Sequence, residues 1–279
     1  MTTLEILKNI AAFLEEDIGT GDVTASLVPK ATQATAEVIT RDPLVLCGRD
    51  WFDAVFFALD PTIEIDWLVA EGDKVEAGTL LCNLRGKARA LLTGERTALN
   101  LLQTLSATAT VSRQYAEAVA GTRCTVLDTR KTIPGLRAAQ KYAVSVGGCA
   151  NHRLGLYDAV LIKENHIAAA GSITAAIQQA RQLTTLSVEV EVESLQELQE
   201  ALAAKPERIM LDNFTIDDLR TAVAMVAIAP DKVELEASGN IALSNIRIIA
   251  ETGVDYISIG ALTKNIQAID LSLRIVLIK

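Results

Sequence analysis

The stretch SVEVEVESLQELQEALAAKPERIMLD (187–212) decides the fold class of this chain. An apolar run at 187–192 is followed by a helix-like segment at 194–204 and by a second apolar run at 208–212. This order is typical of two parallel strands joined by a crossover helix, because antiparallel neighbours need only a short turn. The stretch therefore predicts one repeat of a parallel α/β sheet.

The same alternation continues on both sides of this stretch. The predicted strands lie at 125–128, 158–163, 187–192, 208–212, 232–237 and 255–260, and the predicted helices at 172–183, 194–204, 215–227 and 241–251. Six strands in this order predict an α/β fold with an incomplete β/α barrel, and a doubly wound open sheet is the alternative. No GxGxxG sequence follows any of these strands, which argues against a dinucleotide-binding sheet.

The N-terminal third has a different pattern. Strand-like segments at 34–39 and 63–69 flank a short helix at 50–59, and a long helix is predicted at 93–119. A first helix is indicated by an apolar stripe at Leu4, Ile6, Leu7, Ile10, Ala11 and Leu14. Helices and strands are mixed here without the regular repeat of the barrel.

This change of pattern predicts two domains. The end of the chain at 270–279 is strand-like and is expected to return to the N-terminal part. We therefore expect an N-terminal α/β sandwich domain over residues 1–108, joined by 266–279, and a C-terminal β/α barrel domain over 109–265.

The composition excludes several classes of protein. The chain has 279 residues and a formal net charge of −9, so it can bury a large core but lacks the broad basic surface that nucleic-acid binding needs. No apolar run approaches about 18 residues, and the acidic amphipathic N-terminus is unlike a signal peptide, so no membrane partner is expected. The cysteines show no paired spacing, which indicates neither zinc nor disulfides and fits a cytoplasmic protein.

The segment from Asp128 to His166 is basic although the chain is acidic. Six cations lie in it, namely Arg130, Lys131, Arg137, Lys141, Arg153 and Lys163, against the single acid Asp158 between them. The cations lie at the ends of apolar runs, which is the pattern of an anion site at the C-terminal ends of buried strands. A solvated basic helix face is the alternative.

Acidic side chains lie on three of the later predicted strands. Glu189, Glu191 and Glu193 alternate and therefore point to one side of a strand. Carboxylates inside a barrel would have to meet cations, a metal ion or solvent, and a half-exposed edge strand is the alternative. Asp212 and Glu236 follow on the next two strands. Acids that face lysine and arginine suit a pyrophosphate ligand bound with Mg²⁺.

Two glycine-containing segments are candidates for binding a phosphate group. Ser238-Gly239-Asn240 precedes a predicted helix, and the segment from Gly260 to Lys264 follows the last predicted barrel strand. Backbone N–H groups at the ends of the last strands of a barrel form a common phosphate site. Either glycine taken alone is explained by a turn.

Seven motifs occur in one order along the chain. They are GERTALN (94–100), DTRKTIPGLRAAQKYAV (128–144), GGCANHRLGLYDAVLIKENHI (147–167), VEVEV (188–192), MLDNF (210–214), LEASGNI (235–241) and GVDYISIGALT (253–263). Together they resemble the quinolinate phosphoribosyltransferase family, whose members are also called carboxylating nicotinate-nucleotide pyrophosphorylases. The motifs cover most of the chain beyond residue 90, and the N-terminal third matches more loosely.

The resemblance implies transfer of the phosphoribosyl group of phosphoribosyl pyrophosphate (PRPP) to quinolinate. Decarboxylation accompanies the transfer and gives nicotinate mononucleotide, pyrophosphate and CO₂ in de novo NAD biosynthesis, with Mg²⁺ as cofactor. By the family's motifs the substrate-binding residues are Arg96, Arg130, Lys131, His152, Arg153, Lys163, Glu191, Asp212, Ser238, Gly239, Gly260 and Lys264. Lys131, Glu191 and Asp212 are expected to be catalytic, and Glu191 and Asp212 to bind Mg²⁺ directly or through the substrate.

The resemblance also implies a homo-oligomer. Family members lend Arg96 from the neighbouring subunit of a homodimer, and a higher homo-oligomer such as a hexamer is the alternative. Arg96 lies in the first turn of the helix predicted at 93–119, where a cation opposes the helix dipole, which hints at a purpose other than stability. The chain departs from the family at Lys264-Asn265, where His-Ser is common, and at Cys149, where a third glycine is common.

Other functions stay open on the sequence alone. Nicotinate phosphoribosyl transfer, and a decarboxylase-like paralogue found with molybdenum transport genes, would use the same fold. A barrel aldolase could use Lys163 as a Schiff-base lysine if its ammonium were desolvated. A non-catalytic carrier is suggested by residues 69–86, which resemble the hammerhead sheet of lipoyl and biotinyl carriers but lack their displayed lysine.

Overall fold

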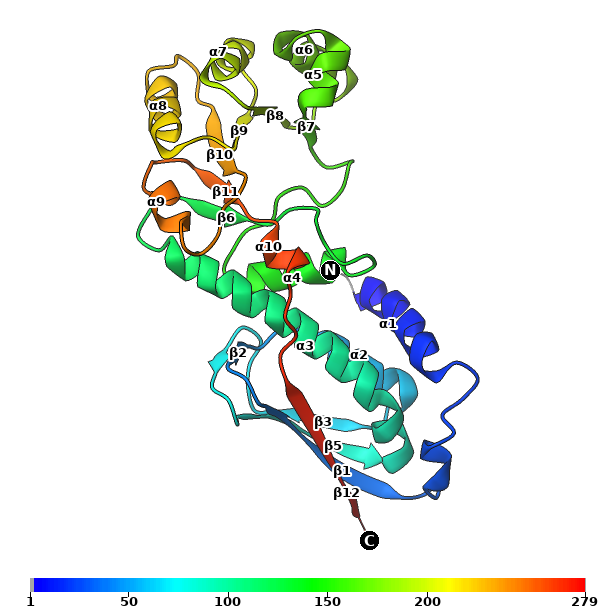
Figure 1. Cartoon of the computed structure of the whole chain (residues 1–279). Coiled ribbons are helices and arrows are strands. Elements are labelled where there is room, and N and C mark those ends of the chain that lie inside the picture. The colour runs from blue at the N-terminus through cyan, green and yellow to red at the C-terminus, as the bar shows by residue number, and fades with distance from the viewer. Residues whose placement is uncertain (1–2, 279) are drawn as a thin grey trace. The chain divides into compact units, whose positions relative to one another are not determined.

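The computed structural model describes residues 3–278, with side chains from residue 9 onward, and the chain folds into two compact units (Figure 1). Unit 1 contains Met1–Arg113, Ile133–Gly148 and Asn265–Lys279. Unit 2 contains Gln114–Thr132 and Cys149–Lys264. Each unit has a main sheet of its own, antiparallel in unit 1 and parallel in unit 2.

The sheet of unit 2 is an open β/α barrel. Its strands are β6 (Thr125–Leu127), β7 (Val160–Ile162), β8 (Val188–Val192), β9 (Arg208–Asp212), β10 (Glu234–Ser238) and β11 (Tyr256–Ser258). They pair in parallel in the order β6-β11-β10-β9-β8-β7. From β7 to β11 each strand pairs with the next in sequence, whereas a doubly wound sheet would reverse direction. Within residues 3–278 no strand pairing joins β6 to β7, so the barrel is open there and the predicted incomplete barrel is confirmed.

Helices cover the outer side of this sheet (Figure 1). They are α5 (Glu164–Ala170), α6 (Ile173–Leu183), α7 (Leu195–Ala204), α8 (Ile216–Ala227) and α9 (Ile246–Ala250), and the short α10 (Ala261–Lys264) follows β11. The hydroxyls of Ser172, Ser194 and Thr215 accept hydrogen bonds from backbone N–H groups in the first turns of α6, α7 and α8. These N-caps fix where each helix begins after its strand. The predictions for these three helices are confirmed, and α9 is shorter than its predicted range.

Alternation along β8 separates an apolar outer side from a charged interior. The three valines of VEVEV are buried, and so are Glu189 and Glu191 between them. In the ladder with β9, Glu189 aligns with Arg208 and Glu191 with Met210. The expectation that the glutamates share one side is confirmed for Glu189 and Glu191, whereas Glu193 lies beyond the end of β8 and is exposed. The edge-strand alternative is wrong because β8 pairs on both sides, with β7 and with β9.

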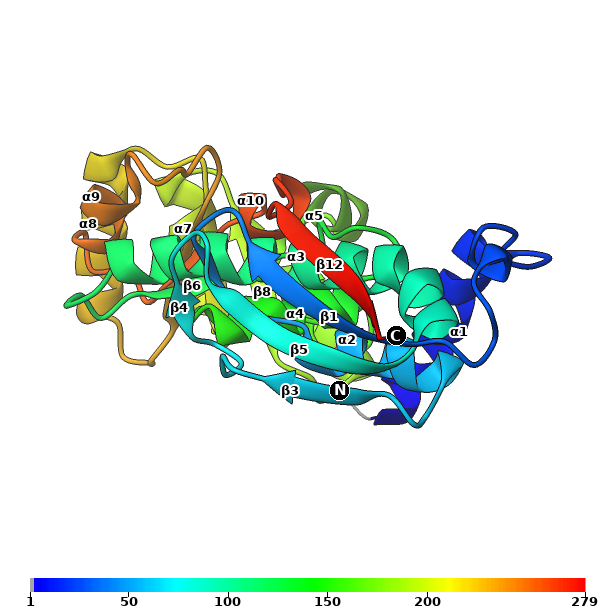
Figure 2. The same cartoon turned by 90° about the horizontal axis from the view of Figure 1, so that it is seen from below.

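The sheet of unit 1 pairs antiparallel in the order β12-β1-β5-β3 (Figure 2). Its strands are β1 (Gln33–Thr40), β3 (Glu64–Trp67), β5 (Leu80–Lys87) and β12 (Leu271–Ile278), while β2 (Leu44–Val45) and β4 (Lys74–Val75) form a separate pair. The helices are α1 (Thr3–Ile18), α2 (Arg49–Leu59), most of α3 (Ala88–Ala118), α4 (Arg137–Val146) and the short η1 (Ala25–Leu27). β12 pairs with β1 along its whole length, so the predicted return of the chain's end is confirmed.

An apolar core fills unit 1. Trp51, Phe52 and Phe56 on α2 are each at most 2% exposed. The ring of Phe52 packs edge-on against Phe56 and Trp67, with centroids 5.0 Å and 5.3 Å apart. This aromatic cluster anchors α2 against the sheet by burying large side chains, the main favourable contribution to folding.

The predicted first helix is confirmed, but its apolar stripe is only partly so. Ile10 and Leu14 are buried, whereas Ala11 is exposed. Leu4, Ile6 and Leu7 lie outside the side chains that the structure describes. Of the three stripe residues whose side chains are described, two therefore face the core.

α4 is a helix that the sequence pattern did not predict. α4 belongs to unit 1, whereas the predicted domain limits include its residues in the barrel domain. The domain limits stay a prediction. Gly147 follows α4 where a Cβ would lie 2.4 Å from Ser112 Cβ and 2.5 Å from the Ala109 carbonyl oxygen of α3. Only glycine allows the backbone to approach α3 so closely.

Candidate active site

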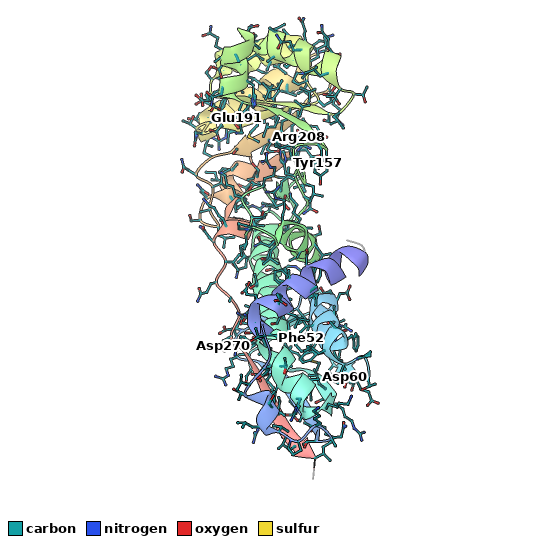
Figure 3. The ribbon with its side chains drawn as sticks, turned by 90° about the vertical axis from the view of Figure 1, so that its right-hand side faces the viewer. Phe52, Asp60, Tyr157, Glu191, Arg208 and Asp270 are labelled. Atoms are coloured by element: carbon teal, nitrogen blue, oxygen red, sulfur yellow. The ribbon has the colours of Figure 1, made fainter. Side chains whose placement is uncertain are left out.

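The C-terminal ends of the barrel strands surround a cavity of about 350 Å³ in unit 2. Its lining consists of Thr129, Arg130, Lys131, His152, Arg153, Leu161, Lys163, Glu191, Met210, Asp212, Glu236, Ser238 and Ser258. Figure 3 labels Glu191 and, on the neighbouring strand, Arg208, which belongs to the network below the cavity. All six strands contribute residues near or just beyond their ends, which is where barrel enzymes place their active sites.

Eight of the twelve substrate-binding residues implied by the resemblance line this cavity: Arg130, Lys131, His152, Arg153, Lys163, Glu191, Asp212 and Ser238. The other four do not line it. Gly239, Gly260 and Lys264 belong to the same unit, and Arg96 belongs to unit 1.

The cavity has a cationic side and an acidic side. Its cations lie in segments next to the two strands at the open side of the barrel: Arg130 and Lys131 follow β6, Arg153 precedes β7 and Lys163 follows it. Its carboxylates, from Glu191, Asp212 and Glu236, lie on β8, β9 and β10. Such a site orients a ligand that carries anionic groups at one end.

Lys163 is held at the cavity by the start of α5. Its backbone N–H donates to Nδ1 of His166 at 3.0 Å, which places the second histidine of the basic segment in a helix cap. Its ammonium forms an ion pair with Glu191, whose side chain is 8% exposed. A charged and paired ammonium argues against the Schiff-base role of an aldolase lysine, which requires a desolvated neutral amine.

The side chain of Lys131 lies over Gly260. A Cβ at Gly260 would stand 3.1 Å from Lys131 Cδ and 3.9 Å from its Nζ. The Thr263 hydroxyl donates to the Lys131 carbonyl at 2.8 Å, which ties the loop after β6 to the segment after β11. The candidate phosphate segment at Gly260 therefore has an ammonium beside it, and a side chain at this position would push against Lys131.

Gly239 is required by the turn after β10. Its φ is +94°, and a Cβ there would lie 2.2 Å from Oδ1 of Asn213. The same Oδ1 accepts a hydrogen bond from Nδ2 of Asn240 at 3.0 Å, so two strand ends are joined here. The expectation that a helix follows this segment directly is wrong. α9 begins only at Ile246, after a turn in which the Ala242 carbonyl accepts from the Ile246 N–H.

Buried hydrogen bonds fix His152 at the floor of the cavity. Asp128, which is fully buried, accepts a hydrogen bond from the His152 backbone N–H at 2.9 Å. The Arg153 backbone N–H donates to His152 Nδ1 at 2.8 Å. His152 Nε2 lies 2.9 Å from Glu189 Oε2 and 3.4 Å from Glu236 Oε2. Protein groups thus lie within 3.4 Å of both ring nitrogens.

Two observations on the charge of His152 point in opposite directions. Burial lowers the pKa of its imidazole, but Glu189 and Glu236 outweigh this and raise the pKa to about 9. A cationic ring, however, would turn an Nδ1–H towards the N–H of Arg153, whereas the hydrogen bond between them needs a lone pair on Nδ1. We therefore assign the neutral tautomer with the proton on Nε2. His152, Glu189 and Glu236 are close enough to hold a metal ion, but a protonated Nε2 cannot ligate one.

The two buried glutamates beside His152 differ in their surroundings. For Glu189, burial raises the pKa and is only partly offset by His152 and Arg208. For Glu236, the effect of burial is outweighed by the neighbouring polar groups of His152 and Ser258 and by Arg208, whose Nη1 lies 3.3 Å away, so its pKa is lowered. Arg208 favours the ionised form of Glu236 even when the imidazole of His152 is neutral. Glu236 is therefore the member that keeps a negative charge at the floor of the cavity.

Four of the lining residues were not singled out from the sequence: Thr129, Leu161, Met210 and Ser258. Glu236 was named there among the acids that suit a pyrophosphate ligand bound with Mg²⁺, and it lines the cavity. A signal for Met210 was present, because it lies two residues before Asp212 and shares the inward side of its strand. Counting back by two from this strand end would have found it.

Besides Lys264, three cations named from the sequence lie outside the cavity lining. Arg137 and Lys141 are four residues apart on α4 in unit 1. Lys141 is 2% exposed, so the alternative of a solvated helix face is wrong for this residue. Arg96 is exposed on α3, and the argument from the helix dipole is wrong because α3 begins at Ala88 rather than at residue 93.

Comparison with known proteins identifies the family of this chain. The family model of the quinolinate phosphoribosyl transferase C-terminal domain matches residues 108–274, and that of the N-terminal domain matches residues 22–106. The chain belongs to the quinolinate phosphoribosyl transferase family. None of its helices within residues 3–278 has the length and apolarity needed to cross a membrane.

Relatives of this family match over most of their length. A probable nicotinate-nucleotide pyrophosphorylase (carboxylating) of Synechocystis sp. is 45% identical over 266 residues, which cover 95% of this chain and 90% of that protein. The solved structure of the nicotinate-nucleotide pyrophosphorylase from Francisella tularensis has a TM-score of 0.94 at 48% identity and covers 99% of this chain and 97% of that one. The structure of human nicotinic acid phosphoribosyltransferase has a TM-score of 0.65 at 12% identity, a likeness of fold alone.

Proposed function

We infer that this chain transfers the phosphoribosyl group of PRPP to quinolinate with decarboxylation, giving nicotinate mononucleotide, pyrophosphate and CO₂ in de novo NAD biosynthesis. The observation that carries this proposal is the division of one cavity into four cations on one side and three carboxylates on the other. Quinolinate has two carboxylates, and PRPP brings further anionic groups. The four cysteines are unpaired and buried, which supports the further proposal of a cytoplasmic location.

The proposed roles follow the charge of each side chain. Arg130 and Arg153 have forked guanidinium groups that suit the carboxylates of quinolinate, and Lys163 can add a third contact while it keeps Glu191 as partner. Lys131 lies beside Gly260, where its ammonium would neutralise phosphate charge as the pyrophosphate leaves. Ser238, Gly239, Gly260 and Lys264 are proposed to hold the phosphate of the phosphoribosyl group.

The sequence of bond changes needs no covalent enzyme intermediate. The bond between the anomeric carbon and pyrophosphate breaks with its electron pair on pyrophosphate, and the lone pair of the ring nitrogen forms the new bond. When CO₂ departs, its electron pair stays on carbon 2, where the positive charge of the adjacent ring nitrogen stabilises it, and a proton from water then adds to carbon 2 to complete the product. The enzyme's part is orientation and electrostatic stabilisation.

Mg²⁺ is proposed as the cofactor, with Glu191 and Asp212 as the residues that hold it directly or through the substrate. Both carboxylates line the acidic side of the cavity and offer the oxygen ligands that Mg²⁺ prefers. Bound there, Mg²⁺ would neutralise charge on the pyrophosphate leaving group. Because Glu191 already pairs with Lys163, Asp212 is the freer of the two to contribute.

We further propose that the active unit is a homodimer in which Arg96 completes the site of the neighbouring subunit, or a higher homo-oligomer such as a hexamer. Arg96 is an exposed cation on α3, away from any ion pair found among the described residues. Residues implied in one site are thus divided between two units of the chain.

The test of the reaction is an assay of the purified chain with quinolinate, PRPP and Mg²⁺, in which nicotinate mononucleotide and CO₂ are followed. A parallel reaction contains nicotinate in place of quinolinate. We expect product from quinolinate only. Product from nicotinate only would show that the argument from two carboxylates is wrong, and no product from either would contradict the proposed reaction.

Lys163→Met tests the cationic side against a matched control, Lys87→Met. Each lysine is partly exposed and ion-paired with a carboxylate whose side chain is at most 8% exposed, Glu191 for Lys163 and Asp60 for Lys87. Only Lys163 lines the cavity. We expect kcat/KM for quinolinate to fall by about 100-fold or more in Lys163→Met and to stay within about threefold in Lys87→Met. Equal losses would show that the effect is structural.

The sharing of Arg96 is tested by complementation. Arg96→Ala and Lys163→Met are each expected to be nearly inactive, and mixed dimers formed by co-expression contain one site with neither substitution. If subunits mix at random, about a quarter of the wild-type activity should return. No recovery in mixtures that contain mixed dimers would contradict the sharing of Arg96, while leaving the reaction itself untouched.

A further inference from the structure

Glu236 differs from the other two carboxylates that line the cavity. Glu191 is ion-paired with Lys163, and Asp212 is partly exposed and accepts a hydrogen bond from Nδ2 of Asn213 at 2.7 Å. Glu236 is fully buried in the floor, and its Oε1 accepts no hydrogen bond from the described residues. A buried carboxylate oxygen without a partner needs an explanation, because such groups are costly and are usually satisfied.

The charges below the cavity leave Glu236 with negative charge that is not balanced. Arg208 lies 3.3 Å from Glu236 and also 3.3 Å from Glu234, so one guanidinium serves two carboxylates. The imidazole of His152 likewise lies between Glu189 and Glu236. Two carboxylates, Glu234 and Glu236, thus share the one guanidinium of Arg208, and with the neutral imidazole assigned above their summed charge stays negative.

Positive charge develops on the substrate in the proposed reaction, on which this inference rests. When the ring nitrogen gives its lone pair to the anomeric carbon, it becomes a pyridinium. The cations beside β6 and β7 hold the carboxylates of the ring, and the floor of the same cavity carries Glu236. We propose that Glu236 stabilises this pyridinium, and the cationic transition state before it, by its buried negative charge.

The negative charge of Glu236 acts differently on the substrate before the reaction and on the ring as it becomes cationic. Before reaction the ligand is the quinolinate dianion, which a negative floor repels. As the ring becomes cationic, the same charge attracts it, and a buried carboxylate acts with little screening by water. An interaction that is favourable only as the reaction proceeds lowers the barrier without tightening the binding of the substrate.

Glu236→Gln tests this by removing the charge while keeping the shape and one carbonyl oxygen. We expect kcat to fall by about 100-fold, in the range found when one electrostatic stabiliser is removed. By calorimetry, the affinity for quinolinate should stay equal or increase, and the affinity for nicotinate mononucleotide, which carries the pyridinium, should fall by about tenfold. A purely structural role would weaken the binding of both ligands together.

Glu234→Gln is the matched control. Glu234 is on the same strand, two residues earlier, and has the same partner, Arg208, at the same 3.3 Å, but it does not line the cavity. This variant should keep kcat and both affinities within about threefold of wild type. Equal losses in Glu234→Gln and Glu236→Gln would overturn the proposal, since they would assign the effect to Arg208. A Glu236→Gln enzyme with wild-type kcat would overturn it as well.

A measurement on the wild-type chain keeps the proposal testable if Glu236→Gln does not fold. N-methylnicotinate has a cationic ring, and 3-methylbenzoate has the same shape and carboxylate with an uncharged ring. We expect the wild-type protein to bind N-methylnicotinate at least about tenfold more tightly. Equal affinities would overturn the role of Glu236. Because this comparison needs no turnover, it is decided independently of whether the wild-type chain makes nicotinate mononucleotide.

Discussion

The interiors of the two units contain different kinds of side chains. Unit 1 is filled by apolar side chains, among them the aromatic cluster of Trp51, Phe52 and Phe56. The barrel of unit 2 has apolar residues on its outer side, but its interior holds carboxylates that are at most 8% exposed, such as Glu189, Glu191 and Glu236. One interior supplies stability directly, whereas the other holds charges that stay buried only because cations and hydrogen bonds accompany them.

This difference separates what stabilises the fold from what performs chemistry. A charged interior is a poor source of stability, since desolvation offsets much of the attraction between paired charges. Its retention along three neighbouring strands, β8, β9 and β10, indicates that the charges serve the ligand. Substitutions that remove matched groups from the two interiors should therefore have different consequences for stability and for activity.

The largest loss of stability is expected from Phe52→Ala in the apolar interior of unit 1. Phe52 is fully buried between two aromatic rings, and deleting a buried phenyl ring costs about 3–5 kcal/mol of unfolding free energy. Phe57→Ala on the same helix is the control, because Phe57 is 44% exposed and should lose less than about 1 kcal/mol. Urea denaturation followed by circular dichroism measures both, and similar losses would contradict the account of this core.

A smaller loss, about 2–4 kcal/mol, is expected from Arg208→Ala in the charged interior of unit 2, because Glu236 is left buried without its guanidinium. The ring of Tyr256, 3.9 Å from the guanidinium carbon, also loses its cationic partner. The double variant Arg208→Met, Glu236→Leu should recover most of this stability but not the activity, since an apolar pair removes the buried charge. A double variant no more stable than Arg208→Ala would show that the ionic contacts themselves hold the barrel together.

The sequence pattern predicts the strands of the barrel well but the segments between them less well. Runs such as VEVEV and RIMLD are short, apolar and flanked by capped helices, so local preferences and tertiary packing agree there. α3 begins five residues before its predicted start because β5 runs into it at Lys87 without a loop. α4 was missed because its cations were assigned to an anion site, although one of them, Lys141, is buried in the helix.

In the candidate site, too, some residues could be predicted from the sequence and others could not. Residues at strand ends, such as Lys163 and Asp212, are marked in the sequence by the break in apolar pattern and by the motifs of the family. The network of His152, Glu236 and Arg208 was not found, because it depends on the register between strands that are far apart in the sequence. Register is set by three-dimensional packing, which single-strand patterns do not contain.

The smallest effect is expected from a partly buried charge in unit 1. Asp53 on α2 accepts a hydrogen bond from Nε1 of Trp67 at 2.9 Å, and burial raises its pKa from the ordinary value of 3.8 to about 6. Because the folded state favours the protonated acid, the stability that Asp53 contributes is present below pH 4 and is lost as the pH rises through 6.

Asp53→Asn keeps the acceptor for Trp67 and removes the charge, so it should stabilise the protein by about 1–2 kcal/mol at pH 7.5 after allowance for partial exposure, and by much less at pH 4.5. Asp50→Asn on the same helix is the control, because Asp50 is exposed in the first turn and its loss should give only a small decrease through the helix dipole. Urea denaturation at the two pH values gives both differences. An Asp53→Asn protein that is less stable at pH 7.5 would mean that the carboxylate is effectively paired, with Arg49 as its nearest cation, and that buried charge in unit 1 is compensated as it is in unit 2.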